Sequence, residues 1–506
     1  MSDSRPDAIP AIALAAVAAP PASDRAGWRA YWTERGWPWR GEAEIDAERQ
    51  AYLAARRMFP ADVERGVYPF NDMTPALTRA DLEWLLATAP AGARLDLRGT
   101  DLRGLDLRGL PLAGLRGGLT EDEWRNATAR QIEAAALHAE TTDFGGADLA
   151  GAVLEGAHLE GARLRDADLR DASLSFAFLE GAVLADARLE RAALLGALLD
   201  GATISGARLE HANLSSASLA GADLFGAHLE GAQLRAAHLA GKALTPDALA
   251  RVRRARPDLP ATLPGASIGG AFFDSATLLD DARLGDETYG GVAVADARWG
   301  GVNLAVVDWA PLKTLGDERE ARTAAHDGTP KDETTRFAEL RTAVRANRQL
   351  AVALREQGLN EEADRFAYRA QLAQREVLRR QALGRDAPGQ VSAERRAQRL
   401  GAYVFSSFLD LLAGYGYKPG RSLAAYLGSL LVFAVAYFAL GQSGAQPLSL
   451  VDAMALSINS FHGRGFLPGT VAVSDAVTML TALEAVLGLI IEISFIATFT
   501  QRFFAR

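Results

Sequence analysis

Residues 147–171 read ADLAG AVLEG AHLEG ARLRD ADLRD, and the same five-residue unit continues without interruption far beyond this stretch. Leu, Ile or Phe occupies every fifth position from Phe144 to Leu239, and Ala stands two residues before each from Ala147 to Ala237. A period of five fits neither an α-helix, which repeats every 3.6 residues, nor a flat strand, which repeats every two. We therefore expect a chain that turns after every fifth residue and stacks Leu and Ala inside a solenoid.

The A-(D/N/x)-L-x-x unit resembles the pentapeptide-repeat family. The resemblance implies a right-handed quadrilateral β-helix with one pentapeptide on each side and four in each coil. Such units begin near Leu97, so the solenoid is expected over 94–312, with helical insertions at 118–141 and 242–262. After the second insertion the inward positions are expected at Ile268, Phe273 and Leu278 and, after a slip of one residue, at Leu284, Tyr289, Val294, Trp299, Leu304 and Trp309.

The composition excludes several kinds of chemistry. At 506 residues the chain is too long for a single core, and it contains no cysteine and only seven dispersed histidines. The net charge of -9 argues against a general nucleic-acid binder. No nucleophile–base set, metal cluster or phosphate-binding loop is visible in the sequence. We therefore expect no enzyme activity, catalytic residue, cofactor or bound metal.

The residues before the repeats predict a tail and a cap. Residues 1–24 are proline-interrupted and lack a true signal-peptide core, so a disordered tail is expected there. Residues 25–93 contain several tryptophans and predict a helical cap, in which Thr78 and Asp81 form a capping box. A solenoid needs its open end covered, and this domain is placed to cover it.

The residues after the repeats predict a second helical region. A polar linker at 313–331 leads to a basic helical hairpin at 332–400, broken at Gly358. Part of it resembles one tetratricopeptide-repeat hairpin, which leaves two alternatives open. The hairpin is either a spacer or oligomer contact, which we favour, or a peptide-binding groove.

Two stretches near the C-terminus are long and apolar enough to cross a bilayer, at 421–441 and 475–501. An amphipathic segment at 401–415 precedes them and predicts a helix lying in the membrane interface. Basic residues flank the outer ends of both spans, namely Lys418, Arg421, Arg502 and Arg506. The positive-inside rule then places both termini in the cytoplasm and the protein in the cell (inner) membrane, in contact with lipid.

The loop between the spans decides the functional hypothesis. Residues 448–468 contain an apolar helix too short to cross, capped by Ser449, followed by Gly463-x-Gly465. This order resembles the two-span pore loop of the potassium-channel superfamily. The resemblance implies a bacterial ion channel that is a homotetramer, with the filter-like residues Ser460, Phe461, His462, Gly463, Arg464, Gly465 and Phe466.

The loop also departs from the family pattern. Matched on the glycines, Phe461 and His462 stand at the Thr and Val positions, Arg464 at the Tyr position and Phe466 at the Asp position. A ring of Arg464 side chains would repel cations. Alternatively, Arg464 pairs with Glu484, which we favour because a lone carboxylate within a span is costly. Potassium selectivity is therefore not carried over.

The second span contributes three further candidates. Glu484, Gly488 and Glu492 are four residues apart and share one helix face. The family's inner helix often bends where Gly488 stands. Glu492 either lines a water-filled cavity, bonds a neighbouring helix, or reaches the lipid interface. His462 would sense pH only if exposed to water; packing within the loop is the alternative.

These features support two hypotheses about function. The first is an ion channel with a cytoplasmic solenoid that senses a signal or docks a partner. The alternative is a membrane-anchored scaffold whose solenoid binds a cytoplasmic protein and whose hairpin does not conduct. A DNA-mimicking solenoid, and with it a nucleic-acid-related role, is disfavoured because arginines interrupt the acidic surface: Arg163, Arg165, Arg170, Arg188, Arg191 and Arg208.

Overall fold

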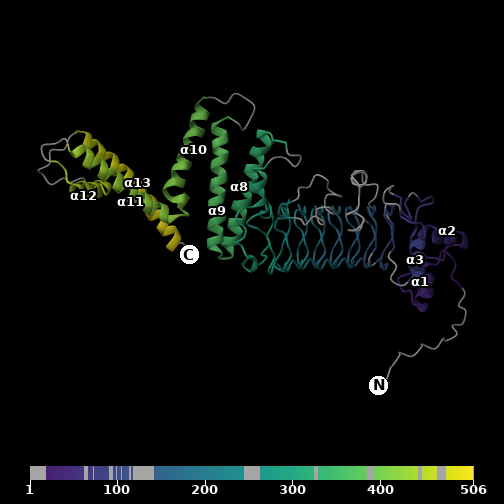
Figure 1. The fold of residues 1–506 in the computed structure, drawn as a ribbon. Helices are drawn as coiled ribbons and strands as arrows, with labels where there is room; N and C mark the ends of the chain where they lie inside the picture. Colours follow the sequence, from purple (N-terminus) through teal and green to yellow (C-terminus); the bar gives the residue numbers. More distant parts are fainter. Residues whose placement is uncertain are drawn as a thin grey trace, which may run out of the picture. The chain divides into compact units, whose positions relative to one another are not determined.

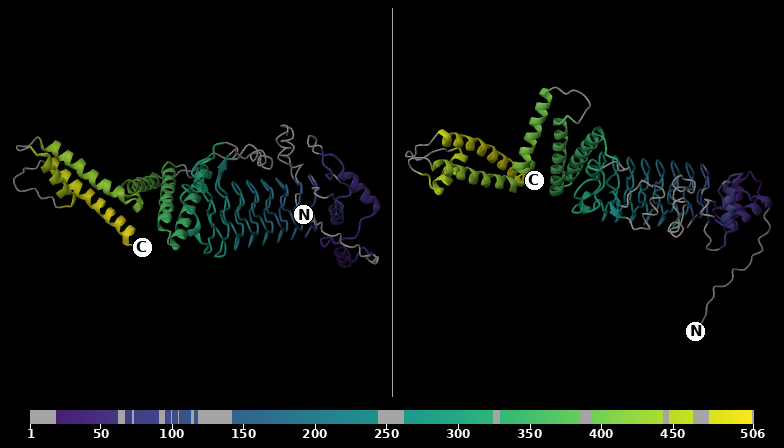
Figure 2. Two further views of the ribbon diagram at one scale, coloured as in Figure 1. Left: turned by 60° about the horizontal axis from the view of Figure 1, so that its bottom comes forward. Right: turned by 45° about the horizontal axis from the view of Figure 1, so that its top comes forward.

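The computed structural model describes residues 19–61, 67–71, 73–90, 95–98, 100–103, 105–112, 115–117, 142–243, 262–323, 329–384, 393–442, 447–463 and 475–504. The chain forms two compact units (Figures 1 and 2). One contains an N-terminal helical domain and the repeats up to Arg319, and the other contains the helices that follow Thr329.

Three helices form the N-terminal domain: α1 (Arg25–Glu34), α2 (Ala47–Arg57) and α3 (Arg79–Ala87). Each begins at a side chain that accepts a backbone N–H, and the expected capping box of Thr78 with Asp81 is present at α3. Trp28 and Trp32 are buried and stacked, with ring centroids 5.5 Å apart. These two tryptophans therefore pack in the core of the N-terminal domain.

Helix α3 is attached to the first repeat coil through one arginine. Arg79 is buried, and its Nη1 donates to the carboxylate of Asp106 at 3.0 Å and to the carbonyl of Asp106 at 2.9 Å. Its Nη2 donates to the carbonyl of Arg108 at 3.0 Å, and its Nε donates to Glu83 at 2.8 Å. The helical domain thus contacts the end of the solenoid at the position predicted for a cap.

The repeats form coils of four pentapeptides. Parallel bridges join residues twenty positions apart, as in the series Asp148, Asp168, Arg188 and Arg208. Because each unit has five residues, twenty residues make four units per coil. The Leu and Ala of each unit point inward and are at most 2 % exposed from Ala147 to Leu239. The ladder consists of single-residue bridges at each side, and the turns between them carry positive φ angles.

The inward column after the second insertion differs from the expectation at two positions. Leu278 makes the outward bridge to Gln233, and Leu279 is the buried residue. The extra residue is absorbed one turn earlier, where Asp274 accepts hydrogen bonds from the backbone of Ala276 and Thr277. Tyr289 is also outside the inward column; it is half-buried in a turn.

Both insertions leave the ladder in register. The bridge Asp101–Asp143 crosses the first insertion, and the bridge Asp223–Ser267 crosses the second. The strands β1 (Lys242–Ala243) and β2 (Thr262–Leu263) pair antiparallel where the second insertion leaves and rejoins the coils. The predicted helices at 118–141 and within 244–261 lie outside the described residues.

The last coil ends in two short elements, η1 (Leu304–Val306) and α7 (Gly316–Glu320). The buried carboxylate of Asp317 accepts the backbone N–H of Val294 at 2.8 Å. The indole Nε1 of Trp309 donates to the carbonyl of Leu304 at 2.9 Å. These bonds satisfy backbone groups that an open solenoid end would expose.

Charged residues on the solenoid surface lie in pairs of opposite sign rather than in blocks of one sign. Each of the six arginines that interrupt the acidic residues lies within 4.0 Å of a carboxylate. Arg188, for example, contacts both Asp168 and Glu190. The surface therefore lacks an extended stripe of unpaired acid around these six residues.

The second unit begins with a helical hairpin, α8 (Glu333–Glu356) and α9 (Asn360–Ala382). Gly358 provides the left-handed turn between them, with φ +78°. Helix α10 (Ala393–Ala413) follows and ends at η2 (Gly414–Gly416). It starts eight residues before the predicted interfacial segment, because no Gly or Pro interrupts the helix-forming residues 393–400.

Three apolar helices complete the chain: α11 (Pro419–Gly441), α12 (Leu450–Phe461) and α13 (Asp475–Phe504). By length and composition, two segments of the described chain could cross a membrane. They are Gly420–Gly441, with mean hydropathy 2.1, and Ala476–Ile496, with mean hydropathy 2.0. Helix α12 packs beside both (Figure 1).

Candidate functional site

The candidate site is the end of α12, and its position follows from where that helix starts. Ser449 caps α12 by accepting the N–H of Asp452 at 3.1 Å. The N–H of the preceding Leu448 donates to the carbonyl of Gly441 at 3.3 Å, at the C-terminal end of α11. Helix α12 therefore starts beside the end of the first apolar span.

The other end of α12 lies near the middle of both spans. The hydroxyl of Ser457 is 3.0 Å from the carbonyl oxygen of Leu430, halfway along Gly420–Gly441. The carbonyl oxygen of Phe461 lies against Gly488, near the middle of Ala476–Ile496. Helix α12 thus runs back alongside α11 and stops at mid-span.

Gly488 makes this stop possible. A Cβ at this position would lie 2.2 Å from the carbonyl oxygen of Phe461, closer than real atoms approach. Helix α13 is continuous through Gly488, so the glycine provides a close backbone contact between α12 and α13. A bend at Gly488, where the family's inner helix often bends, is not present in this structure.

A polar cluster joins all three helices behind α12. Glu484 of α13 is fully buried, and one of its carboxyl oxygens accepts the hydroxyl of Tyr437 of α11 at 2.6 Å. The other oxygen is 2.5 Å from the hydroxyl of Ser457 of α12. A buried carboxyl group without partners would cost several kcal/mol, on the order of 5. The cluster therefore fixes the three helices relative to one another.

Phe461 packs inside its own chain. Its ring lies edge-on to Tyr426, with centroids 4.9 Å apart, and it belongs to one buried apolar cluster with Leu412, Leu430 and Ile491. It is 1 % exposed. The phenylalanine at the filter-like Thr position thus anchors the end of α12.

The remaining filter-like residues divide into described and undescribed ones. Ser460 is buried, His462 is exposed with Nδ1 2.9 Å from the carbonyl oxygen of Ile458, and Gly463 has φ +67°. The predicted positions of Arg464, Gly465 and Phe466 lie outside the described residues. Glu492 is half-buried on α13.

The sequence predicts Glu484 as a residue of the site, but it does not predict the hydroxyl groups that bind its carboxyl group. The expected partner, Arg464, lies outside the described residues, and the described contacts come from Tyr437 and Ser457. The sequence contains one feature that could have indicated a partner on α12. Ser457, Ser460 and Phe461 are spaced three and four residues apart, which puts both hydroxyl groups on the face of α12 that packs inward.

Asp410 joins α10 to the hairpin and to the first span. Its carboxylate accepts hydrogen bonds from Tyr368 and Arg375 of α9, at 2.9 and 2.5 Å, and from Arg421 of α11 at 2.8 Å. Burial alone would raise the pKa of Asp410, but the bonds from Arg375 and Tyr368 outweigh it, so the pKa lies below its ordinary value. The carboxylate therefore stays ionised at neutral pH.

The outward columns of the solenoid differ in charge. One column contains Asp148, Asp168, Arg188, Arg208 and His228. The next column contains only uncharged residues in the same coils: Val153, Ser173, Ala193, Asn213 and Gln233. Neighbouring exposed side chains at the turns include Phe176 and Leu195.

Comparison with known proteins identifies the repeats. The family model described as Pentapeptide repeats matches residues 147–185, 167–206, 179–215 and 204–241. No curated protein matches the chain.

Several solved structures of repeat proteins are similar to this chain. A pentapeptide repeat protein from the thylakoid lumen of Arabidopsis thaliana is 30 % identical over 26 % of this chain and 71 % of that one, with TM-score 0.16. HetL, involved in heterocyst differentiation regulation in the cyanobacterium Nostoc, is 20 % identical over 50 % of this chain and 100 % of its own, with TM-score 0.18. QnrB1, a plasmid-mediated fluoroquinolone resistance protein, is 15 % identical over 45 % and 82 %, with TM-score 0.18.

These structural alignments have TM-scores too low to support an argument of their own. The assignment rests on the family model and on the twenty-residue bridge spacing, which agree over the same residues. Residues 147–241 of this chain are pentapeptide repeats.

Proposed function

We propose that the C-terminal hairpins of several copies of this chain surround an ion-conducting pore, with the residues after α12 forming its constriction. The observation that supports this proposal is the return of α12 to mid-span, where it stops at Phe461 against Gly488. In this proposal the solenoid is a cytoplasmic arm that senses a signal or docks a partner.

The length of α12 supports the argument. Twelve residues make a helix of about 18 Å, whereas the hydrocarbon core of a bilayer is about 30 Å thick. The chain that follows Phe461 must therefore continue from mid-depth. Irregular backbone is tolerated there only where protein buries it or where it lines a water-filled cavity.

The outer face of α12 is apolar and exposed on a single chain, so we expect other molecules to cover it. Leu450, Val451, Met454 and Ile458 are 42 to 77 % exposed on one chain. Their apolar side chains suit lipid or another copy of the hairpin. Several copies arranged about an axis would cover this face and enclose the residues that follow α12.

Two opposing electrostatic features bear on ion selectivity. The C-terminal end of a helix carries a partial negative charge, so the end of α12 at mid-depth favours a cation. A ring of Arg464 side chains at the pore mouth would favour anions. The ion preference of the proposed pore depends on which of them faces the conduction path.

Recording currents from purified protein in liposomes tests the proposal. Under asymmetric potassium chloride, we expect currents whose reversal potential moves when Arg464 is replaced by Ala. Silence across voltage, pH and lipid composition would argue against a pore.

Because the sequence contains no cysteine, single introduced cysteines give a sharper test of the proposed pore. His462→Cys, at the exposed end of α12, should render the current sensitive to a water-soluble thiol reagent. Val432→Cys is the matched control, because Val432 lies on the first span rather than on the family's inner helix and is 66 % exposed. Block at both positions, or at neither, would contradict a water-filled path at the end of α12.

A membrane-anchored scaffold is the second candidate. The uncharged solenoid column from Val153 to Gln233 favours it, because an uncharged surface beside a charged one suits a protein partner. Silent liposomes together with a partner whose binding is lost in Ala193→Arg would support the scaffold over the channel.

A further inference from the structure

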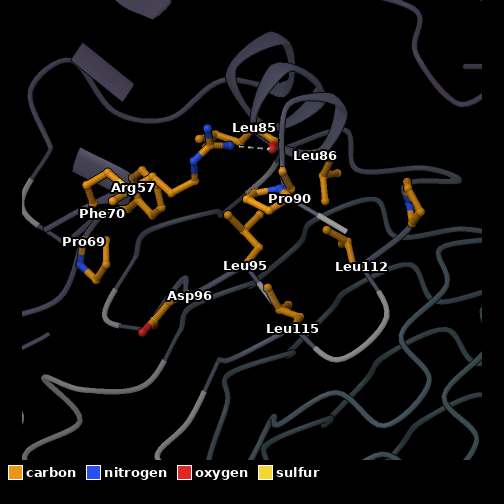
Figure 3. A pocket seen from close by; sticks show the side chains of 13 residues that line it. Arg57, Pro69, Phe70, Leu85, Leu86, Pro90, Leu95, Asp96, Leu112 and Leu115 are labelled. Carbon is orange, nitrogen blue, oxygen red and sulfur yellow. Dashed lines mark hydrogen bonds between the residues drawn. The ribbon is translucent and has the colours of Figure 1, made fainter. Parts of the chain in front are cut away.

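A cavity of about 280 Å³ lies between the N-terminal helical domain and the first repeat coil, outside the proposed pore (Figure 3). One wall comes from α3 and the chain after it, including Leu85 and Pro90, and the other from the repeats, including Leu95, Leu112 and Leu115. Pockets at the junction of two substructures are common ligand sites. Because most of the lining is apolar, we expect a ligand whose main part is apolar.

Two charged residues line this cavity, and among the described residues only one of them has an oppositely charged partner. Asp96 receives Nε of Arg98 at 2.8 Å and Nη2 of Arg98 at 2.5 Å. Arg57 forms no ion pair with any carboxylate among the described residues. Among the described residues, the cavity therefore presents one positive charge without a carboxylate partner.

Among the described residues, the hydrogen-bond partners of Arg57 all lie on one nitrogen of its guanidinium. Nη1 donates to the carbonyl of Leu85 at 3.2 Å and to the hydroxyl of Thr88 at 3.1 Å, which uses both of its hydrogens. Nε and Nη2 make no hydrogen bond to a described residue. These two N–H groups form the fork that binds the two oxygens of a carboxylate side by side.

We propose that this cavity binds a small molecule with an apolar body and one carboxylate. The carboxylate lies on the Nε–Nη2 edge of Arg57, and the body packs against Leu95, Leu112 and Leu115. The site is independent of the proposed pore, because it belongs to the N-terminal domain and the first coil.

The test uses the full-length protein in nanodiscs, with 3-phenylpropionate as the probe. This molecule has one carboxylate and one ring, and its neutral amide, 3-phenylpropionamide, has the same shape. Ligand-observed magnetic resonance and calorimetry should detect the acid, with affinity for the amide lower by about tenfold or more. Equal binding of acid and amide, or no binding of the acid, would overturn the proposal.

Two arginines at the end of α2 provide matched variants. Arg57→Gln should lower affinity for the acid by about tenfold or more and leave the weak binding of the amide unchanged. Arg56→Gln should change neither, because Arg56 donates to Tyr52 and does not line the cavity. Equal losses in both variants would contradict the assignment of Arg57.

A third variant covers the case in which Arg57→Gln fails to fold. Ala89 lines the cavity and is half-buried, so Ala89→Leu would fill part of the space while leaving Arg57 in place. We expect it to exclude acid and amide alike with an unchanged thermal melting curve. Retained binding of the acid in this variant would place the ligand elsewhere.

Discussion

The carbonyl oxygen of Phe461 lies so close to Gly488 that a methyl group on this glycine would come within 2.2 Å of the oxygen. Phe461 ends a helix that cannot cross a membrane, and Gly488 lies near the middle of one that can. The contact therefore fixes the depth at which α12 stops, and every functional statement about the hairpin depends on that depth.

Gly488→Ala should destabilise the hairpin. Overpacking of this kind costs about 1–3 kcal/mol, and the higher helix propensity of Ala recovers at most about 1 kcal/mol. Gly428→Ala is the matched control, because Gly428 also lies within a span and a Cβ there would meet nothing within 4 Å. Thermal unfolding in detergent should show a lower midpoint for Gly488→Ala alone. Equal midpoints for the two variants would contradict the close contact.

Tyr437→Phe should destabilise the three-helix cluster, because it leaves one oxygen of the buried Glu484 without its donor. Such a loss typically costs about 1–3 kcal/mol. Glu484→Leu removes the polar group as well, so adding Tyr437→Phe to it should cost much less. A double-mutant cycle on thermal or denaturant unfolding measures this coupling. Additive effects would indicate that the hydrogen bond between Tyr437 and Glu484 contributes nothing.

The sequence predicts the solenoid better than the hairpin site, for a physical reason. A strict period of five assigns each inward Leu and Ala locally, without knowledge of distant contacts. The prediction is wrong where the period breaks: Leu278 and Leu279 are adjacent and equally apolar, and only the turn at Asp274 decides which points inward. The five-residue period alone does not determine which of the two leucines points inward.

A different reason explains why the partners of Glu484 could not be predicted from the sequence. Tyr437, Ser457 and Glu484 come from three helices, and no sequence spacing relates them. Charge alone suggested Arg464, because an opposite charge is the commonest partner of a buried carboxylate. The hydroxyl groups of Tyr437 and Ser457 reach the carboxyl group because α12 packs between the two spans.

Ala192→Val should destabilise the solenoid, because Ala192 points inward and is fully buried beside the leucine column. Overpacking costs about 1–3 kcal/mol. Ala193→Val is the matched control one residue away, since Ala193 points outward in the bridge to Asn213. Hydrogen exchange of the repeat amides should increase in Ala192→Val and not in Ala193→Val. Equal exchange would contradict the inward assignment.

The contact between cap and solenoid should depend on pH through Asp106. Hydrogen bonding from Arg108 lowers the pKa of Asp106, burial opposes it, and the bond from Arg25 lowers it further. A carboxyl group whose folded pKa is depressed contributes stability that is present above its unfolded pKa, about 3.9, and is lost as pH falls through the folded value. Asp106→Asn should therefore cost about 1.5–3 kcal/mol at pH 7, and the difference from the wild type should shrink progressively as the pH falls below about 3.9.

Arg79 explains why Asp106 should matter more than other acids of the first coil. The side chain of Arg79 is 9 % exposed and would lose one of its two carboxylate partners, keeping only Glu83. Asp101 is the matched control: it pairs with Arg103, but both side chains are more than half exposed and solvent screens the pair. Denaturant unfolding of the two Asn variants at pH 7 and pH 3 checks the prediction. A pH-independent difference between Asp106→Asn and the wild type would show that the ionised carboxylate does not hold the cap on the solenoid.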